Sequence, residues 1–265
     1  MDLTLLMTDL HVAPPGVPVA GLDPWARLDL ALSVALERHP DAGRLILLGD
    51  LSHRGEPETY ARLADRLAAL PVPVHPMLGN HDRRTGFARG FAGHTDEEGF
   101  AQTVVDLDTH RLILCDTLDE AAPDRHSGLI CARRMEWLER ALETAGGRRI
   151  VVLTHHHLFA TGFPGMDRIA LRNAAEVAEL LRAHPVDLVV SGHVHSPISG
   201  MNGGLAWCVL PGTCHQMPMQ LGDEKTTSSS HAPGGYGVLL TGAEGAVVHV
   251  ASTERPTVID EPGSA

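Results

Sequence analysis

The chain has 265 residues, with 21 basic and 33 acidic side chains, and its net charge is −12 when the histidines are neutral. A hydrophobic content of 43% is enough for a substantial core, which excludes intrinsic disorder over most of the length. The acidic balance argues against a general nucleic-acid binder and against a protein that binds anionic membranes, because both need a basic face.

Two further features of the composition bear on chemistry and location. The 17 histidines call for a search for a metal site, because imidazole is the commonest metal ligand. The 4 cysteines have no metal-binding spacing and are expected to be free thiols of a reducing compartment. The N-terminal apolar run breaks at Thr8-Asp9, and no other run approaches about 18 apolar residues. We therefore expect a cytoplasmic protein that does not interact with membranes.

Short apolar runs rich in Val, Ile and Leu predict strands that are buried on both faces. In chain order they are Leu3 to Met7, Arg44 to Leu48, Val72 to Leu78, Ile150 to Leu153, and Asp187 to Val190. Helical patterns run from Pro24 to Leu36, from Pro57 to Leu70, from Arg133 to Ala145, and from Arg172 to His184. Strands that alternate with helices predict an α/β layered fold.

The remaining segments suggest one domain over residues 1–253. Glycines among charged residues predict a loop from Arg83 to Glu98. Two further glycine-rich turns predict a loop or lid over about residues 196–237. The tail at 254–265 is expected to be mobile.

Each of the five apolar runs is followed by a polar cluster. In chain order the clusters read TDLH, GD, GNHD, THHH and SGHVH. Ligand-binding residues collect at the carboxyl ends of strands in α/β sheets, so we expect these clusters to meet along one sheet edge. One such cluster alone is weak evidence, but the ordered set resembles the calcineurin-like metallophosphoesterases over roughly Leu3 to Gln216.

The resemblance implies a four-layer α/β/β/α sandwich of two mixed sheets, with a dinuclear metal site at the carboxyl ends of the strands. It implies three kinds of ligand position: Asp9, His11 and His195 for one ion, Asn80, His155 and His193 for the other, and Asp50 as a bridge. The donor set mixes imidazole, carboxylate and amide without thiolate, which suits Mn, Fe or Zn better than Mg or Ca.

The charge of such a site favours an anionic ester. Two divalent ions, two carboxylates and a hydroxide leave about one positive charge, which can attract a phosphodiester in spite of the acidic chain. Paired metal ions about 3.5 to 4 Å apart can generate hydroxide near neutral pH and stabilise the entering and leaving oxygens. The expected reaction is hydrolysis of a phosphate ester by a metal-activated hydroxide, without a covalent enzyme intermediate.

Two residues beside the ligand Asn80 have separate expected roles. The resemblance gives His81 contact with the phosphoryl group or protonation of the leaving oxygen. The alternative is that His81 only orients a metal ligand. Asp82 is expected to act behind the ligands by fixing the tautomer of a neighbouring histidine.

The triple histidine departs from the family pattern, which usually reads HHPP, whereas this chain reads HHHLF. Because adjacent side chains alternate in direction beyond a strand, at most one or two of the three can reach the metals. His155 matches the ligand position, His156 is expected behind it, and His157 is expected to be structural or exposed. His53 and His75 are expected not to be ligands.

Two later segments resemble the branch of bacterial glycerophosphodiesterases and class III cyclic nucleotide phosphodiesterases. They are GFPGMDRIALRN, from Gly162 to Asn173, and PGTCHQMP, from Pro211 to Pro218. The second implies that His215 contacts the substrate; the alternative is a histidine at a strand end with no role.

The expected protein is therefore a phosphodiesterase for small phosphodiesters, with cyclic nucleotides, glycerophosphodiesters and phosphonate monoesters as candidate substrates. A phosphomonoesterase of the same fold is the main alternative. A nuclease would need a basic track, and a scaffold without catalysis would be expected to have lost ligands. The expected partner is a small molecule rather than a nucleic-acid polymer. Family members often pair through the C-terminal part, so a homo-oligomer is one alternative.

Overall fold

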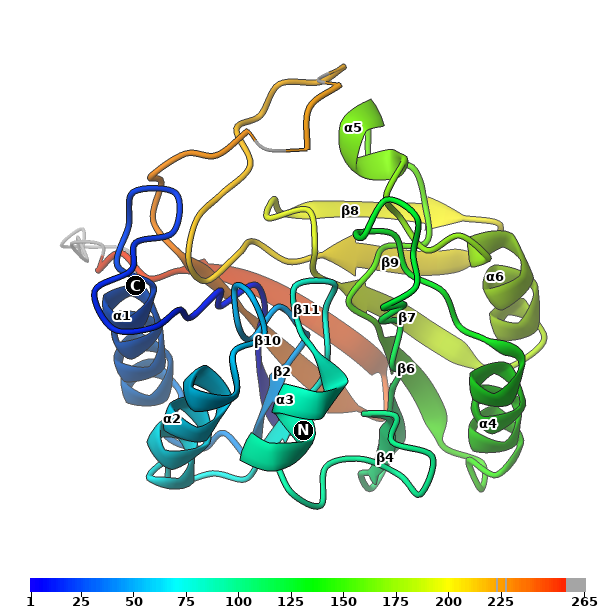
Figure 1. Cartoon of the computed structure of the whole chain (residues 1–265). Coiled ribbons are helices and arrows are strands. Elements are labelled where there is room, and N and C mark those ends of the chain that lie inside the picture. The colour runs from blue at the N-terminus through cyan, green and yellow to red at the C-terminus, as the bar shows by residue number, and fades with distance from the viewer. Residues whose placement is uncertain (223, 227, 256–265) are drawn as a thin grey trace, which may run out of the picture.

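The computed structural model of the chain describes residues 1–222, 224–226 and 228–255. Within these residues two β-sheets lie face to face, and helices cover the outer face of each sheet (Figure 1). The four-layer α/β/β/α arrangement expected from the sequence is confirmed.

The first sheet contains the N-terminal strands and the last two strands. Its order is β11 (Gly245–Ser252), β10 (Gly235–Gly242), β1 (Asp2–Met7), β2 (Arg44–Leu47) and β3 (Val74–Pro76). The strands β1, β2 and β3 are parallel, whereas β10 runs antiparallel to β1 and β11. Helices α1 (Pro24–Arg38) and α2 (Pro57–Ala68) pack on its outer face.

The second sheet has the order β4 (Thr103–Asp106), β5 (His110–Leu114), β6 (Arg149–Leu153), β7 (Val186–Ser191), β9 (Leu205–Val209) and β8 (Ile198–Asn202). Its central strands β5, β6, β7 and β9 are parallel. Helices α4 (Ala132–Glu143) and α6 (Ala174–Arg182) cover its outer face. The short helix α5 (Pro164–Asp167) stands apart from them, above β8 and β9 (Figure 1).

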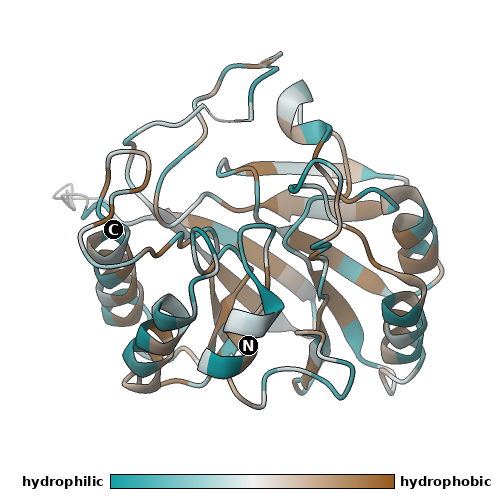
Figure 2. Ribbon diagram, in the orientation of Figure 1, coloured by the Kyte–Doolittle hydropathy of each residue, from teal (hydrophilic) through white to brown (hydrophobic). Residues whose placement is uncertain are grey.

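Alternating side chains explain why the strands are apolar on both faces. In β2 and just beyond it, Leu45 and Leu47 pack under the helices, while Ile46 and Leu48 pack against the second sheet. A strand with helices on one face and a sheet on the other has no solvent-facing side, so successive residues are all apolar. In Figure 2 the central strands are accordingly mostly brown, and teal is found mainly in the helices and the connecting loops.

The expected strands and helices are present. Two segments that we expected to be loops contain regular secondary structure instead. The 196–237 segment contains β8 and β9, and β10 begins within it. The 83–98 segment contains helix α3 (Arg84–Gly90). Its glycines permit close packing, because a side chain at Gly86 or Gly90 would overlap Tyr60 of α2. These glycines therefore mark a helix–helix contact rather than a loop.

Three smaller expectations concern the termini and the thiols. Most of the 254–265 tail lies outside the described residues. The four cysteines are free, and Cys115, Cys208 and Cys214 are buried. No helix in the described part of the chain is long and apolar enough to cross a membrane.

Candidate metal centre

The five polar clusters meet where the carboxyl ends of the two sheets come together. The clusters after β1, β2 and β3 come from the first sheet, and those after β6 and β7 come from the second. The sequence led us to expect one sheet edge, whereas the site is built from two. Facing sheets can surround a site from both sides, which a single edge cannot do.

The backbone at these clusters is unusual. Seven described residues other than glycine have positive φ, and five of them are expected metal ligands: Asp9, His11, Asp50, His193 and His195. This conformation is uncommon for side chains with a Cβ and costs on the order of 1 kcal/mol or more per residue. Such strain collects at functional sites, where the surrounding structure holds it in place.

Glycine explains how two clusters approach each other. A side chain at Gly79 would overlap Oδ1 of Asp50, and one at Gly49 would lie 2.6 Å from the amide nitrogen of Gly79. The glycines of the GD and GN pairs therefore allow the turns after β2 and β3 to touch. This contact places Asp50 beside Asn80.

One group of ligand atoms surrounds a single point. The side chains of Asp9, His11, Asp50 and His195 offer ligand atoms that all lie within 4.8 Å of one another. Nε2 of His195 lies 3.1 Å from Oδ1 of Asp9 and 3.2 Å from Nε2 of His11. Oδ1 of Asp9 is buried and has no hydrogen-bond partner. An unpartnered carboxylate oxygen beside two converging imidazole nitrogens fits a bound transition-metal ion.

A second group shares Asp50. Nε2 of His155 lies 3.4 Å from Oδ1 of Asp50 and 3.1 Å from Oδ1 of Asn80. The other carboxylate oxygen of Asp50, Oδ2, lies 3.6 Å from Nε2 of His11. Asp50 thus directs one oxygen toward each group, as a bridging carboxylate would. The ring of His193 lies 5.1 Å from the ring of His155, on the side of this second group.

Backbone carbonyls orient three of the histidines. Nδ1 of His155 donates to Leu48 O at 2.8 Å, and Nε2 of His193 donates to Ile169 O at 3.1 Å. Nδ1 of His195 donates to the carbonyl of His215 at 3.0 Å. Each bond holds a proton on the outer ring nitrogen and directs the other nitrogen toward the group of candidate ligands, the orientation that a metal-binding histidine needs.

The protonation states of three candidate ligands suit a cation. Burial would raise the pKa of Asp50, but the neighbouring His155 and His81 imidazoles outweigh it and hold this pKa well below its usual range. Burial holds the pKa of His11 and of His193 well below the ordinary value, so these imidazoles are neutral. Ionised carboxylates and neutral imidazoles are the protonation states that metal binding requires.

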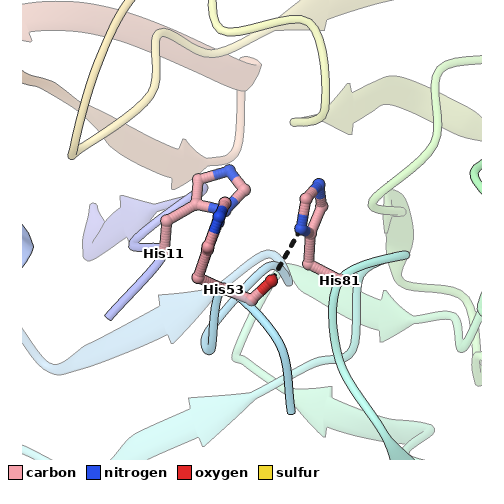
Figure 3. Close-up of side chains that lie close together, drawn as sticks. All are labelled: His11, His53 and His81. Atoms are coloured by element: carbon pink, nitrogen blue, oxygen red, sulfur yellow. Dashed lines mark hydrogen bonds between the residues drawn. The ribbon is translucent and has the colours of Figure 1, made fainter. Parts of the chain in front are cut away.

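The two non-ligand residues expected at the site line the same pocket. His81 and His215 border a cavity of about 330 Å³ that five of the candidate ligands also line. Nδ1 of His81 donates to the carbonyl of His53 at 2.8 Å, drawn as the dashed line in Figure 3. Its other nitrogen, Nε2, is left for a substrate. The ring of His215 lies 4.3 Å from that of His195.

The other two histidines of the triplet, His156 and His157, are buried beside the site and contact neighbouring protein groups. His156 is fully buried, and both its ring nitrogens are engaged, Nδ1 with Thr117 Oγ1 at 2.8 Å and Nε2 with the carbonyl of His126 at 2.9 Å. His157 is also buried, with Nε2 3.3 Å from Oδ1 of Asp167. His157 is therefore a structural residue and not an exposed one.

Two pocket residues were not singled out from the sequence as part of the site. Nδ2 of Asn80 donates to Nδ1 of His126 at 3.1 Å, which turns the amide oxygen of Asn80 toward His155. His126 belongs to an irregular segment after β5, so no strand-end pattern marked it. His53 also lines the pocket, with Nδ1 3.4 Å from Nδ1 of His11 (Figure 3).

The expected role of Asp82 was wrong. Its carboxylate bonds to no histidine but accepts from the backbone N–H groups of Leu51, Ser52 and Gly79 and from the hydroxyl of Tyr60, at 2.8 to 3.1 Å. Burial, followed by the nearby Asp50, raises its pKa to about 6. Asp82 therefore links the turn after β3 to the segment after β2.

Replacing Asp82 with alanine is expected to destabilise the metal-free protein by about 3 kcal/mol, because three buried N–H groups would lose their acceptor. The melting temperature should fall by about 6 to 12 °C. Tyr60→Phe removes one donor to the same carboxylate and should cost about 1 kcal/mol. Equal melting temperatures for Asp82→Ala and the unmodified protein would contradict this role.

Comparison with known proteins agrees with the motifs. The family model of the calcineurin-like phosphoesterases matches residues 3–197. A probable cyclic nucleotide phosphodiesterase of Rhodopseudomonas palustris is 38% identical over 94% of this chain and 91% of its own length. The 3′,5′-cyclic adenosine monophosphate phosphodiesterase CpdA of Pseudomonas aeruginosa is 29% identical over 88% of this chain and 83% of its own.

A solved structure shares the fold. The structure of the purple acid phosphatase PPD1 from yellow lupin seeds superimposes with a TM-score of 0.65 at 15% identity, covering 98% of this chain and 52% of that one. The sequence match over most of the chain and the shared fold agree with the strand-end motifs that converge on Asp50. The chain belongs to the calcineurin-like phosphoesterase family.

Proposed function

We propose that this chain hydrolyses small phosphodiesters, with 3′,5′-cyclic nucleotides as substrates, and that two transition-metal ions assist the reaction. Mn, Fe or Zn fits the ligands best. The proposed ligands are Asp9, His11 and His195 for one ion, Asn80, His155 and His193 for the other, and Asp50 for both. The observation that carries the proposal is the placement of Asp50, whose two oxygens face two separate groups of ligand atoms.

Bound metal ions would supply a nucleophile at neutral pH and positive charge for the phosphoryl oxygens. Side chains of the pocket would protonate the leaving group and contact the substrate. His81, fixed through Nδ1 by the carbonyl of His53, presents Nε2 to the leaving oxygen and can deliver a proton there. We assign substrate contact to His215, which lines the pocket beside His11 and His195.

The charge of the pocket favours a diester over a monoester. Among the described residues, the lining of this cavity includes neither lysine nor arginine. A phosphomonoester carries up to two negative charges and a diester carries one, so a site whose positive charge comes only from metal ions suits the diester. A cavity of about 330 Å³ takes a small molecule rather than a nucleic-acid polymer.

The relatives bear on which diester is used. Those with the greatest coverage here are named cyclic nucleotide phosphodiesterases, which supports cyclic nucleotides over glycerophosphodiesters. Free buried thiols fit the reducing interior of a cell, so we propose a cytoplasmic location.

The test compares substrates on protein that has been stripped of metal and reloaded with Mn. We expect kcat/KM for bis(p-nitrophenyl) phosphate to exceed that for p-nitrophenyl phosphate by about tenfold or more, because charge complementarity favours the monoanion. We also expect cyclic AMP to be hydrolysed, with release of AMP. Faster hydrolysis of the monoester would indicate a phosphomonoesterase, and full activity of the stripped protein would exclude the metal mechanism.

A further inference from the structure

Part of the pocket lining is apolar, although imidazoles make up much of the rest. Met166 of α5, Ile169 just beyond it, Val194 and Met217 all line the cavity. They belong to one buried apolar cluster, which Phe163 and Val209 complete. We call the four lining residues the apolar wall. It is the outer surface of a packed core and not a set of isolated side chains.

The segment that carries Met166 and Ile169 is held in place. Oδ1 of Asp167 accepts from the backbone N–H of Thr161 at 2.9 Å and from its hydroxyl at 2.6 Å. The imidazole of His157 lies 3.3 Å from the same oxygen. Figure 1 shows the helix of this segment, α5, above β8 and β9. The wall therefore exists before any ligand arrives, which lowers the entropy cost of binding.

The wall is also tied to the ligands for the metal ions. His193 donates from Nε2 to the carbonyl of Ile169 at 3.1 Å, and Met217 donates its backbone N–H to the carbonyl of His195 at 2.8 Å. Val194 lies between these two histidines in the chain. A phosphate bound beside His193 and His195 would therefore have apolar side chains next to it.

Neither the phosphate nor a polar alcohol group would gain apolar contact from such a wall. Glycerol or ethanolamine would leave the apolar side chains facing water, whereas a flat heteroaromatic ring would cover them. Methionine suits this contact, because its flexible and polarisable side chain adapts to the face of an aromatic ring. The hydroxyls of Thr226 and Ser229 also line the cavity and offer polar partners to ring nitrogens or sugar oxygens.

We propose that the apolar wall is the subsite for the nucleobase. This inference rests on the proposed function, because it places the phosphate at the metal centre. The wall holds the base by apolar contact, so purines, which cover more of it, bind more tightly than pyrimidines. Leaving-group chemistry stays on the imidazole side, with His81.

The test measures binding of AMP and of ribose 5-phosphate to the Mn-loaded protein by isothermal titration calorimetry. Both carry a phosphate on the same sugar carbon, and only AMP has a base. Met217→Ala should weaken AMP binding about tenfold, because it removes apolar surface from the wall. Binding of ribose 5-phosphate should change less than about twofold.

The control is Met219→Ala, which makes the same change two residues along. Met217 is 6% exposed and Met219 is 77% exposed, so loss of Met219 should leave both affinities unchanged. Met217→Leu keeps most of the apolar surface and should restore most of the AMP affinity. Ile169→Ala is a second variant on a different segment, and a melting curve for each variant shows that it has folded.

Two results would overturn the inference. One is equal affinity of the unmodified protein for AMP and ribose 5-phosphate; the other is a parallel loss of both affinities in Met217→Ala. Failure of the proposed function has a different signature. A phosphomonoesterase would consume AMP during the titration and release inorganic phosphate, and a phosphodiesterase for other diesters would leave cyclic AMP intact.

Discussion

Asp50→Ala is expected to lose bound metal and at least about a thousandfold in kcat, since this carboxylate faces both groups of ligand atoms. Removing it takes a negative charge and a ligand from each group at once. It also takes the acceptor of the His81 backbone N–H, which donates to Oδ1 at 2.8 Å. The only other carboxylate in the described clusters of candidate ligands is Asp9, which belongs to the first group.

Asp50→Asn tests whether the negative charge of this side chain, rather than its shape, is needed to bind the metal ions. The amide keeps one oxygen and the size of the side chain but loses the negative charge and puts an NH₂ group toward one set of ligands. We expect it to retain at most one of the two ions. His53→Ala is the matched control, because His53 lines the same pocket and is expected to be a non-ligand. It should keep both ions and lose less than about tenfold in kcat.

Elemental analysis of the dialysed variants gives the metal content, and kcat is measured with Mn in excess. Two bound ions and normal turnover in Asp50→Ala would exclude a bridging role. Loss of both ions in His53→Ala, with Asp50 intact, would show that His53 belongs to the ligand set.

The sequence was sufficient to predict the central strands and the set of candidate ligand residues that converge at their ends. A strand buried on both faces is continuously apolar, as in β2 and β6, and the polar residue that ends it stands out. All nine residues singled out as ligands, catalytic histidine or substrate contact lie around one centre, although Asp9 and His155 lie deeper than the pocket lining. These residues could be singled out from the sequence because most of them lie in polar clusters that directly follow apolar strands.

Features that depend on distant contacts were not visible in the sequence. Helix α3 contains glycines because it packs against Tyr60, and this contact is known only from the fold. The apolar wall joins Met166, Ile169 and Met217 from irregular segments without any periodic pattern. Asp82 follows His81 in the chain but bonds to backbone groups of Ser52, in the segment after β2, and of Gly79, in its own turn.

His81→Ala is expected to keep both metal ions and to lose about 10² to 10⁴ in kcat on cyclic AMP, the range expected for a positioned acid. Opening the cyclic phosphate releases the 3′ oxygen of ribose, which is a poor leaving group without a proton. The structure leaves Nε2 of His81 for this task, because Nδ1 donates to the carbonyl of His53 (Figure 3).

The leaving group distinguishes proton transfer from stabilisation of charge. A p-nitrophenolate ion leaves without protonation, so the loss on bis(p-nitrophenyl) phosphate should be less than about tenfold if His81 is the acid. His81→Gln sharpens the comparison, because an amide can donate a hydrogen bond to a phosphoryl oxygen but cannot deliver a proton to a leaving oxygen. It should behave like His81→Ala on cyclic AMP.

The pattern across the two variants decides the role of His81. Equal losses on both substrates, partly restored in His81→Gln, would mean that His81 stabilises the phosphoryl oxygens and that another group protonates the leaving oxygen. Loss of metal from either variant would instead mean that the imidazole of His81 helps to hold a metal ion or one of its ligands, because the backbone N–H that donates to Asp50 remains in both variants. A large loss confined to cyclic AMP, with full metal content, follows only if the side chain of His81 delivers the proton.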